Sequence, residues 1–420
     1  MKSLQISMST LRLLTDSRPF INYVSYGLLL LMFSFVGGAL VELILPLDTT
    51  KYLYRAVVLI PGLILLPVQL AQKKFHVFLL PACYLLFGTI STLWSHANGI
   101  NDLGTALERS LYIISLVAVV LYIKEHRKVF DKYLPVVSVL VTLPILFDIV
   151  DFFLFQTNGH QHGRLYGCLG TTHPNTAGLV YGICAIISVT LSVKRDLIYN
   201  RLNWLLLFSG IVSTTAVFLT VSRACSLSLL LALSLFYLIK RRGKGLALAL
   251  LVLFTSGVAA LSINGLKFNE QKITRPIEEV ISRTLISNRV QIWQAMIERM
   301  DTKEYFYGRG LSVDQALKKE TERTEEFIYP HSQLLSSFYY TGAFGTLMHL
   351  MLFLAISYAS LKAALAGKTL LVSLFVMSLL PTFVDGVSIH PYLGYLTPHL
   401  LIFWFLYALA TSEMYTKIDT

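Results

Sequence analysis

Long apolar segments recur along almost the whole sequence, and they limit the possible folds more than any other feature. A helix that spans a bilayer needs about 20 mostly apolar residues. Windows of that length predict helices at residues 20–45, 52–72, 75–95, 105–123, 133–156, 174–193, 203–220, 224–239, 245–263, 333–358, 369–385 and 396–412. The apolar run at 203–239 is too long for one helix, and we divide it at Thr220-Val-Ser-Arg223. The fold class predicted is therefore all-α, a polytopic membrane protein with about twelve transmembrane helices.

The composition supports this prediction and excludes most soluble architectures. Only 14% of the 420 residues are charged, whereas a soluble domain carries roughly 25%. The apolar segments recur from residue 20 nearly to the C-terminus, so we expect one integral membrane domain over residues 1–420. We expect a loop subdomain at residues 265–332, between the ninth and tenth helices.

The distribution of basic residues predicts the orientation of the chain. Lysine and arginine are retained in the short cytoplasmic loops of membrane proteins. With both termini inside, 19 of the 35 basic residues fall in inner segments and five in short outer loops, and the other 11 lie in the 265–332 segment. This asymmetry accounts for the net charge of +11 without a nucleic-acid partner.

The outer 265–332 segment has a helical pattern from Pro276 to Met300. Arg289, Trp293, Met296 and Met300 share one face of that helix. One interpretation is an amphipathic helix on the membrane surface, from which Arg289 extends toward water. The alternative is an arginine that points into the protein at an anionic ligand. Further along, Gly308-Arg309-Gly310 indicates a turn, and His331 stands just before the tenth helix, as a capping residue or a catalyst.

Other polar residues fall at the outer ends of predicted helices, where lipid makes charge costly. Arg223 interrupts a long apolar run, and Asp385 ends the eleventh helix. Arg164, His173 and Asn175 lie in a glycine-rich outer loop. Three of these residues also have an interpretation without a functional role. Arg223 could be an interfacial anchor, Asp385 could belong to a structural ion pair, and His173 could occupy a polar turn.

Arg164, Arg223, Arg289 and His331 are thus all predicted on the outer membrane surface. Arginine is favoured where a planar fork of donors must hold a phosphate or pyrophosphate. No P-loop or GxGxxG motif is present, so an enzyme of this kind would receive its energy within an activated, lipid-borne substrate. No outer DxD-type cluster is present to hold a metal, and we expect the arginines to neutralise the leaving group.

Four short motifs, in this order, resemble those of the O-antigen ligases of bacterial lipopolysaccharide assembly. The larger group also contains O-antigen polymerases and protein O-oligosaccharyltransferases. The motifs are Arg164 with the following His173-Pro-Asn175 segment, Ser222-Arg223, Asn288-Arg289 with Trp293, and His331-Ser332 followed by Gly342 and Gly345. The resemblance covers nearly the whole chain in layout, including the large loop between helices nine and ten.

The resemblance implies a metal-independent, inverting glycosyltransferase of the GT-C membrane type, without a cofactor, in the bacterial inner membrane. Its donor would be polysaccharide on undecaprenyl pyrophosphate, and its acceptor a sugar hydroxyl of lipid A-core at the periplasmic face. His331 would be the general base, a role that its ordinary pKa suits, and Arg223 and Arg289 would bind the pyrophosphate. The substrate-binding candidates are Arg164, Asp385, Asn175 and His173.

Three other functions are alternatives. An O-antigen polymerase uses the same donor, but such enzymes often have two sizeable basic outer loops, whereas the glycine-rich loop here is short. A protein O-oligosaccharyltransferase differs in its acceptor, and we would expect a further recognition region toward the C-terminus. A secondary transporter would place its charges near the bilayer midplane, often within inverted repeats, and neither feature is apparent. The sequence therefore favours the ligase.

Overall fold

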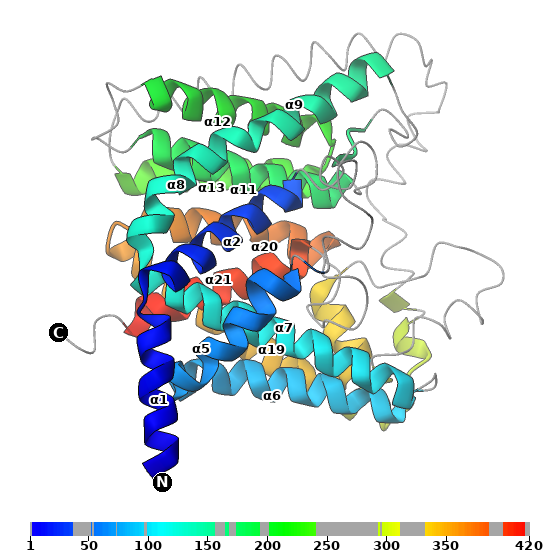
Figure 1. Ribbon diagram of the computed structural model, residues 1–420. Helices are drawn as coiled ribbons and strands as arrows, with labels where there is room; N and C mark the ends of the chain where they lie inside the picture. The colour runs from blue at the N-terminus through cyan, green and yellow to red at the C-terminus, as the bar shows by residue number, and fades with distance from the viewer. Residues whose placement is uncertain are drawn as a thin grey trace.

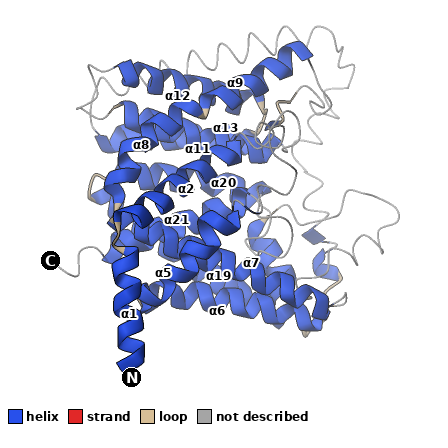
Figure 2. Cartoon of the chain, in the orientation of Figure 1, coloured by secondary structure: helices blue, strands red, loops and turns tan. Residues whose placement is uncertain are grey.

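The computed structural model describes residues 2–36, 52, 54–72, 74–95, 99–155, 164–167, 174–193, 201–240, 293–294, 296–310, 332–385 and 398–415. These residues form helices and short connections, and none of them is in a strand (Figure 2). Six helical stretches in this part are long and apolar enough to cross a membrane, and four shorter apolar helices accompany them. The protein is therefore an all-α, multi-pass membrane protein.

Most of the helices lie side by side in one bundle (Figure 1). They are α2 (Arg18–Val36), α5 (Ile60–Ala71), α6 (Phe75–Ser91), α7 (Gly99–Glu125), α8 (Arg127–Leu140), α9 (Thr142–Val150), α11 (Pro174–Ser192), α12 (Arg201–Leu219), α13 (Arg223–Lys240), α19 (Gln333–Leu365), α20 (Thr369–Asp385) and α21 (Pro398–Tyr415). Short elements extend three of them: the π-helices η1 (Arg55–Leu59) and η3 (Asp151–Phe155) and the 3-10 helix η2 (Thr92–Trp94).

Described helices occupy eleven of the twelve predicted positions, and the ninth, 245–263, lies outside the described residues. The predicted division of the long apolar run is confirmed, because α12 ends at Leu219 and α13 begins at Arg223. Two helices were not predicted, the four-residue α17 (Glu304–Tyr307) and the longer α1 (Lys2–Thr15). α1 precedes the first apolar segment and runs crosswise to the bundle (Figure 1). Its serines, threonines and glutamine lower the mean hydropathy, so a search for spanning segments passes over it.

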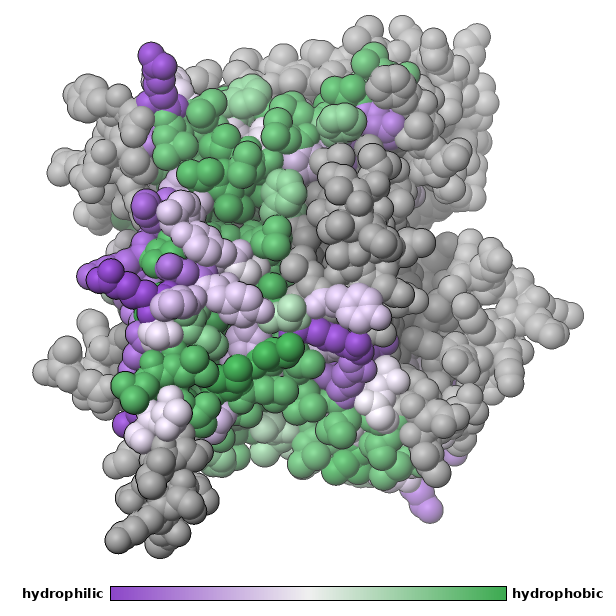
Figure 3. Space-filling view, viewed as in Figure 1, coloured by the Kyte–Doolittle hydropathy of each residue, from purple (hydrophilic) through white to green (hydrophobic). Residues whose placement is uncertain are grey.

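Packing inside the bundle relies on small residues, as is usual between membrane helices. A Cβ atom on Gly62 of α5 would lie 2.3 Å from the Cβ atom of Ser115 in α7. A Cβ on Gly182 of α11 would lie 2.0 Å from the terminal methyl of Met377 in α20. On the outer surface of the bundle, large apolar side chains are exposed, which a lipid environment allows. Hydrophobic residues cover much of the coloured part of the face in Figure 3.

α19 is bent sharply at Gly342, whose φ of +63° and ψ of −166° are not helical. We call residues 333–341 the first arm and residues 343–365 the second arm. In a straight helix, Gln333 and Phe353 would be about 30 Å apart, yet both line one cavity of about 20 Å³. Tyr84 likewise contacts both arms. Its hydroxyl shares a 3.0 Å hydrogen bond with the hydroxyl of Ser337, and its ring centroid lies 6.1 Å from that of His349.

The two arms of α19 therefore lie against each other. The predicted tenth helix at 333–358 is corrected in this respect, because it is two helical arms rather than one continuous span. The physical reason is the conformation of Gly342, which only glycine adopts without strain.

Candidate functional site at the outer ends of the helices

The turn between α12 and α13 presents Arg223 as the first residue of α13. The Ser222 amide donates to Thr220 Oγ1 over 3.3 Å, and the Cys225 amide donates to Ser222 Oγ over 3.5 Å, which caps the start of α13. Val221 has a φ of +53°, a conformation that is strained for a β-branched residue. The turn is thus held in one shape, and the side chain of Arg223 is exposed at its end.

Arg164 ties this turn to the start of α11. Its Nε donates to the carbonyl of Thr220 over 2.9 Å, and its Nη2 donates to Asn175 Oδ1 over 2.8 Å. Cys225 Sγ also donates to the carbonyl of Asn175, over 3.3 Å. The structure therefore joins Arg164 and Asn175 to the turn that carries Arg223. The sequence assigned all three to one surface but gave no sign that they were in contact.

These hydrogen bonds show what Arg164 does within the protein. Two sides of its guanidinium face protein oxygens, so Arg164 orients Asn175 and supports the backbone of the turn. Its role in substrate binding stays a prediction. In contrast, the exposed Arg223 is placed where a ligand could reach it.

Two carboxylates at the end of the predicted fifth helix are deeply buried. Asp148 at the end of α9 is 2% exposed, and Asp151 at the start of η3 is 5% exposed. The hydroxyl of Tyr181 in α11 donates to Asp148 Oδ2 over 2.6 Å. π-Helical turns such as η3 are frequent at functional sites. The sequence does not show that Tyr181, six positions after Asn175, is the partner of Asp148. Only the tertiary structure shows that α11 faces α9 at this point.

A second turn on the outer side follows α17 (Glu304–Tyr307) and contains Arg309. The sequence predicted a turn at Gly308-Arg309-Gly310, and the positive φ of both glycines confirms it. Arg309 Nε lies 3.4 Å from Glu304 Oε1, its Nη1 donates to the Tyr339 hydroxyl over 3.0 Å, and its guanidinium carbon lies 5.7 Å from the centre of that ring. The Arg309 and Glu304 side chains are 15% and 10% exposed.

This second turn is docked onto the first arm of α19 through the main chain. The amides of Arg309 and Gly310 donate to the carbonyls of Tyr339 and Tyr340 over 3.0 and 2.9 Å. The approach is so close that a Cβ atom on Gly342 would lie 2.4 Å from the carbonyl carbon of Phe306. Arg309 was missed as a structural residue because Tyr339 lies 30 positions further along the chain, and because the sequence does not show that Arg309 folds back on Glu304, five positions before it.

The apolar face predicted for the outer helix is confirmed over its described end. Met296 and Met300 are buried, and with Trp293 they line a small cavity against Leu335, Phe338 and Tyr339 of the first arm. The interpretation of this face as one that lies on lipid is wrong for these residues, because the face packs against α19.

Several predicted site residues lie outside the described part of the chain. They are Arg289, His331 and His173. Asp385 is the last residue of α20, and its side chain is among those not described. Ser332, which follows His331 in the sequence, is 6% exposed at the start of the first arm.

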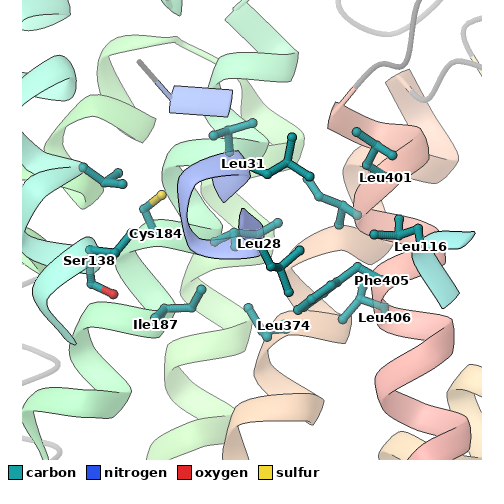
Figure 4. A pocket seen from close by; sticks show the side chains of 15 residues that line it. Leu28, Leu31, Leu116, Ser138, Cys184, Ile187, Leu374, Leu401, Phe405 and Leu406 are labelled. Atoms are coloured by element: carbon teal, nitrogen blue, oxygen red, sulfur yellow. The ribbon is translucent and has the colours of Figure 1, made fainter. Parts of the chain in front are cut away.

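A larger cavity of about 130 Å³ lies among α2, α7, α8, α11, α20 and α21. Leucine, isoleucine, valine and phenylalanine side chains make up most of its lining (Figure 4). The hydroxyl of Ser138 at its edge donates to the carbonyl of Leu134 over 2.8 Å. The described residues that line this cavity suit a hydrocarbon and include no acid, base or cation for catalysis, so we place the candidate site at the arginine-bearing turn instead.

Together the bundle and the site define a multi-pass membrane protein with a polar site that contains Arg164 and Arg223 at one end of its helices. Residues 208–350 match a family model, Wzy_C, described as O-antigen ligase. The match begins in α12, includes the turn with Arg223, and ends in the second arm of α19. It confirms the resemblance to the O-antigen ligase family, whose domain this part of the chain carries. A search of curated proteins finds no match.

The family match also bears on the kind of enzyme. The family implies glycosyl transfer, with lipid-linked polysaccharide and lipid A-core as its general substrates. The three residues predicted to be catalytic, Arg223, Arg289 and His331, all fall inside the matched segment.

Proposed function

We propose that the protein is an O-antigen ligase of the bacterial inner membrane. It transfers polysaccharide from undecaprenyl pyrophosphate to a sugar hydroxyl of lipid A-core at the periplasmic face. The chain acts as one membrane domain, residues 1–420, of the GT-C type, and the 265–332 segment is its periplasmic subdomain. The observation that carries the proposal is the family match at 208–350, which contains all three predicted catalytic residues.

In the proposed reaction, the His331 imidazole takes the proton of the acceptor hydroxyl. The acceptor oxygen then forms a bond to the anomeric carbon of the donor. The bond from that carbon to the pyrophosphate oxygen breaks, and its electron pair leaves with the pyrophosphate, so the anomeric configuration is inverted. No metal or cofactor takes part in this scheme. General base catalysis of this kind typically contributes about 10²- to 10⁴-fold to the rate.

Arg223 and Arg289 hold the pyrophosphate and balance the charge that develops on it. The geometry of the α12–α13 turn supports this role for Arg223, because a cation on a rigid support needs little reorganisation when charge develops. The hydrogen bonds of Arg164 to Thr220 and Asn175 maintain that support. Asp385, Asn175 and His173 remain proposed substrate-binding residues.

A strain that lacks the gene tests the proposal. We expect its lipopolysaccharide gel to show core without O-chains, while undecaprenyl-linked polysaccharide accumulates in the membrane. Single repeats still attached to the core would instead identify the protein as an O-antigen polymerase. An unchanged gel profile would reject both and favour a transporter. Complementation with wild-type protein and with His331→Ala, at equal membrane abundance, controls for effects on neighbouring genes.

A lysine substitution separates charge from geometry at Arg289. We expect Arg289→Lys to be nearly as damaging to ligation as Arg289→Ala, because a point charge cannot reproduce the bidentate fork of arginine. Full ligation by the lysine variant, quantified on the same gels, would remove the proposed clamp.

A further inference from the structure

Two buried polar groups in the first arm of α19 have no hydrogen-bond partner. They are Nε2 of Gln333 and Oγ of Ser336. The two residues are 3% and 1% exposed. They lie three positions apart, so both project from the same side of the arm. Buried polar groups are nearly always paired in native proteins, and exceptions ask for an explanation such as a ligand or a water.

Gln333 lines the cavity of about 20 Å³ between the two arms of α19 and its neighbours α11, α20 and α21. A space of that size holds about one oxygen-sized group. The other polar side chains in its lining are Ser378 and Thr382. Both hydroxyls already donate to the main chain: Ser378 donates to the carbonyl of Leu374, and Thr382 donates to the carbonyl of Ser378. Among the described lining residues, the amide of Gln333 therefore supplies the available donor.

The chemistry of this cavity favours a neutral oxygen over a charged one. Its lining is otherwise apolar, with Phe353, Phe375 and Phe403 among its residues. Burying a charge against such a lining costs far more than burying a hydroxyl that becomes hydrogen-bonded. A phosphate would also prefer an arginine fork to a single amide. A hydroxyl group fits both conditions, whether it belongs to a sugar or to a water molecule.

We propose that Gln333 binds a glycan substrate by donating a hydrogen bond from Nε2 to a sugar hydroxyl. The inference rests on the proposed function and adds a substrate-binding residue to it. In the sequence, Gln333 is two positions from His331, the proposed general base. The sugar belongs to the acceptor core or to the donor polysaccharide, which share this chemistry.

The test is steady-state transfer by the purified full-length protein, with lipid-linked polysaccharide as donor and lipid A-core as acceptor. The variant is Gln333→Met, which keeps the length of the side chain and removes the donor. We expect the KM of one substrate to rise about tenfold, equivalent to about 1.4 kcal/mol of binding free energy. A rise in the acceptor KM assigns the site to the core sugar, and a rise in the donor KM assigns it to the polysaccharide. The thermal midpoint should stay equal or increase, because the change removes an unpaired buried group.

Gln69 of α5 provides the matched control. It is 2% exposed, and its Nε2 donates to the carbonyl of Ala118 over 2.8 Å. Gln69→Met should lower the thermal midpoint and leave both KM values unchanged. If both KM values of Gln333→Met equal those of the wild type, or if its activity falls only in step with its stability, the cavity holds a water or nothing and the inference is wrong. Inactive wild-type protein would overturn the proposed function as well, so the two failures are distinguishable.

Discussion

The turn between α12 and α13 and the turn after α17 use arginine in opposite ways. Arg223 is exposed at the end of a strained turn, whereas Arg309 is mostly buried and contacts Glu304 and Tyr339. The first turn keeps its shape through hydrogen bonds from Arg164, and so it leaves the charge of Arg223 available. The second turn neutralises its own arginine and fixes the first arm of α19. The comparison teaches that residue type alone does not distinguish a ligand-binding arginine from a structural one. The difference lies in whether other side chains of the protein contact the guanidinium.

The largest effect should follow from removing the exposed arginine. Arg223→Ala should lower the ligation rate by about 10²- to 10³-fold, which is typical when one group that stabilises developing charge is lost. The thermal midpoint should change little, because the side chain is exposed. Arg201→Ala, at the exposed start of α12, is the control and should retain activity. Wild-type rates in Arg223→Ala would make this turn a structural anchor.

The buried arginine should affect stability instead. Arg309→Met leaves the carboxylate of Glu304 buried without its cation, and loss of one partner of such a pair costs about 3–5 kcal/mol. The thermal midpoint in detergent should fall clearly. The double variant Glu304→Gln with Arg309→Met should recover much of that loss, because no unpaired charge remains. A single variant as stable as the wild type would contradict the pairing described here.

The bend of α19 should be sensitive to a single methyl group. In Gly342→Ala the residue keeps a positive φ, and the added Cβ atom would lie 2.4–2.5 Å from main-chain atoms of Phe306 and Gly308. The backbone strain and the steric overlap should each cost about 1–3 kcal/mol of folding free energy. Gly367 has a φ of +72° but open space around it, so Gly367→Ala should cost about 1–2 kcal/mol. Gly104→Ala, in open space on α7, should be neutral or slightly stabilising. Denaturation midpoints that do not follow this order would argue against the bend.

The smallest effect concerns Val221. Val221→Gly removes the strain of a β-branched residue at positive φ, which costs about 1–2 kcal/mol. Glycine also raises the entropy of the unfolded chain, which offsets about 1 kcal/mol of that gain in stability. We expect the thermal midpoint to rise slightly. Ligation should fall a few-fold, because a looser turn no longer holds Arg223 in place. An increase in ligation would show that the strained turn does not position the arginine.

The helical segments were largely predictable because each depends on local sequence. Apolar runs of about 20 residues gave the positions of eleven described helices, and the Thr220-Val-Ser-Arg223 interruption gave the boundary between α12 and α13. α1 was missed because an amphipathic helix has a low mean hydropathy. The bend at Gly342 was missed because hydropathy contains no information on φ.

The candidate site was predictable only in part. The sequence placed Arg164, Asn175 and Arg223 on one surface, since loop positions follow from the order of the helices. It did not give the hydrogen bonds that join Arg164 to Asn175 and Thr220, because these groups are 11 and 56 positions away along the chain. The burial of Asp148 and Arg309 was not predicted for the same reason.

The sequence by itself determined the membrane environment of this protein, its helical class and its resemblance to the O-antigen ligase family. These follow from the pattern of apolar residues and from short motifs, and both are local. Only the tertiary structure decided which arginine is paired and which is exposed, and that the two arms of α19 enclose the amide of Gln333. The physical reason is that hydrogen bonds, ion pairs and cavities depend on distances between residues far apart in the chain, which helix packing sets.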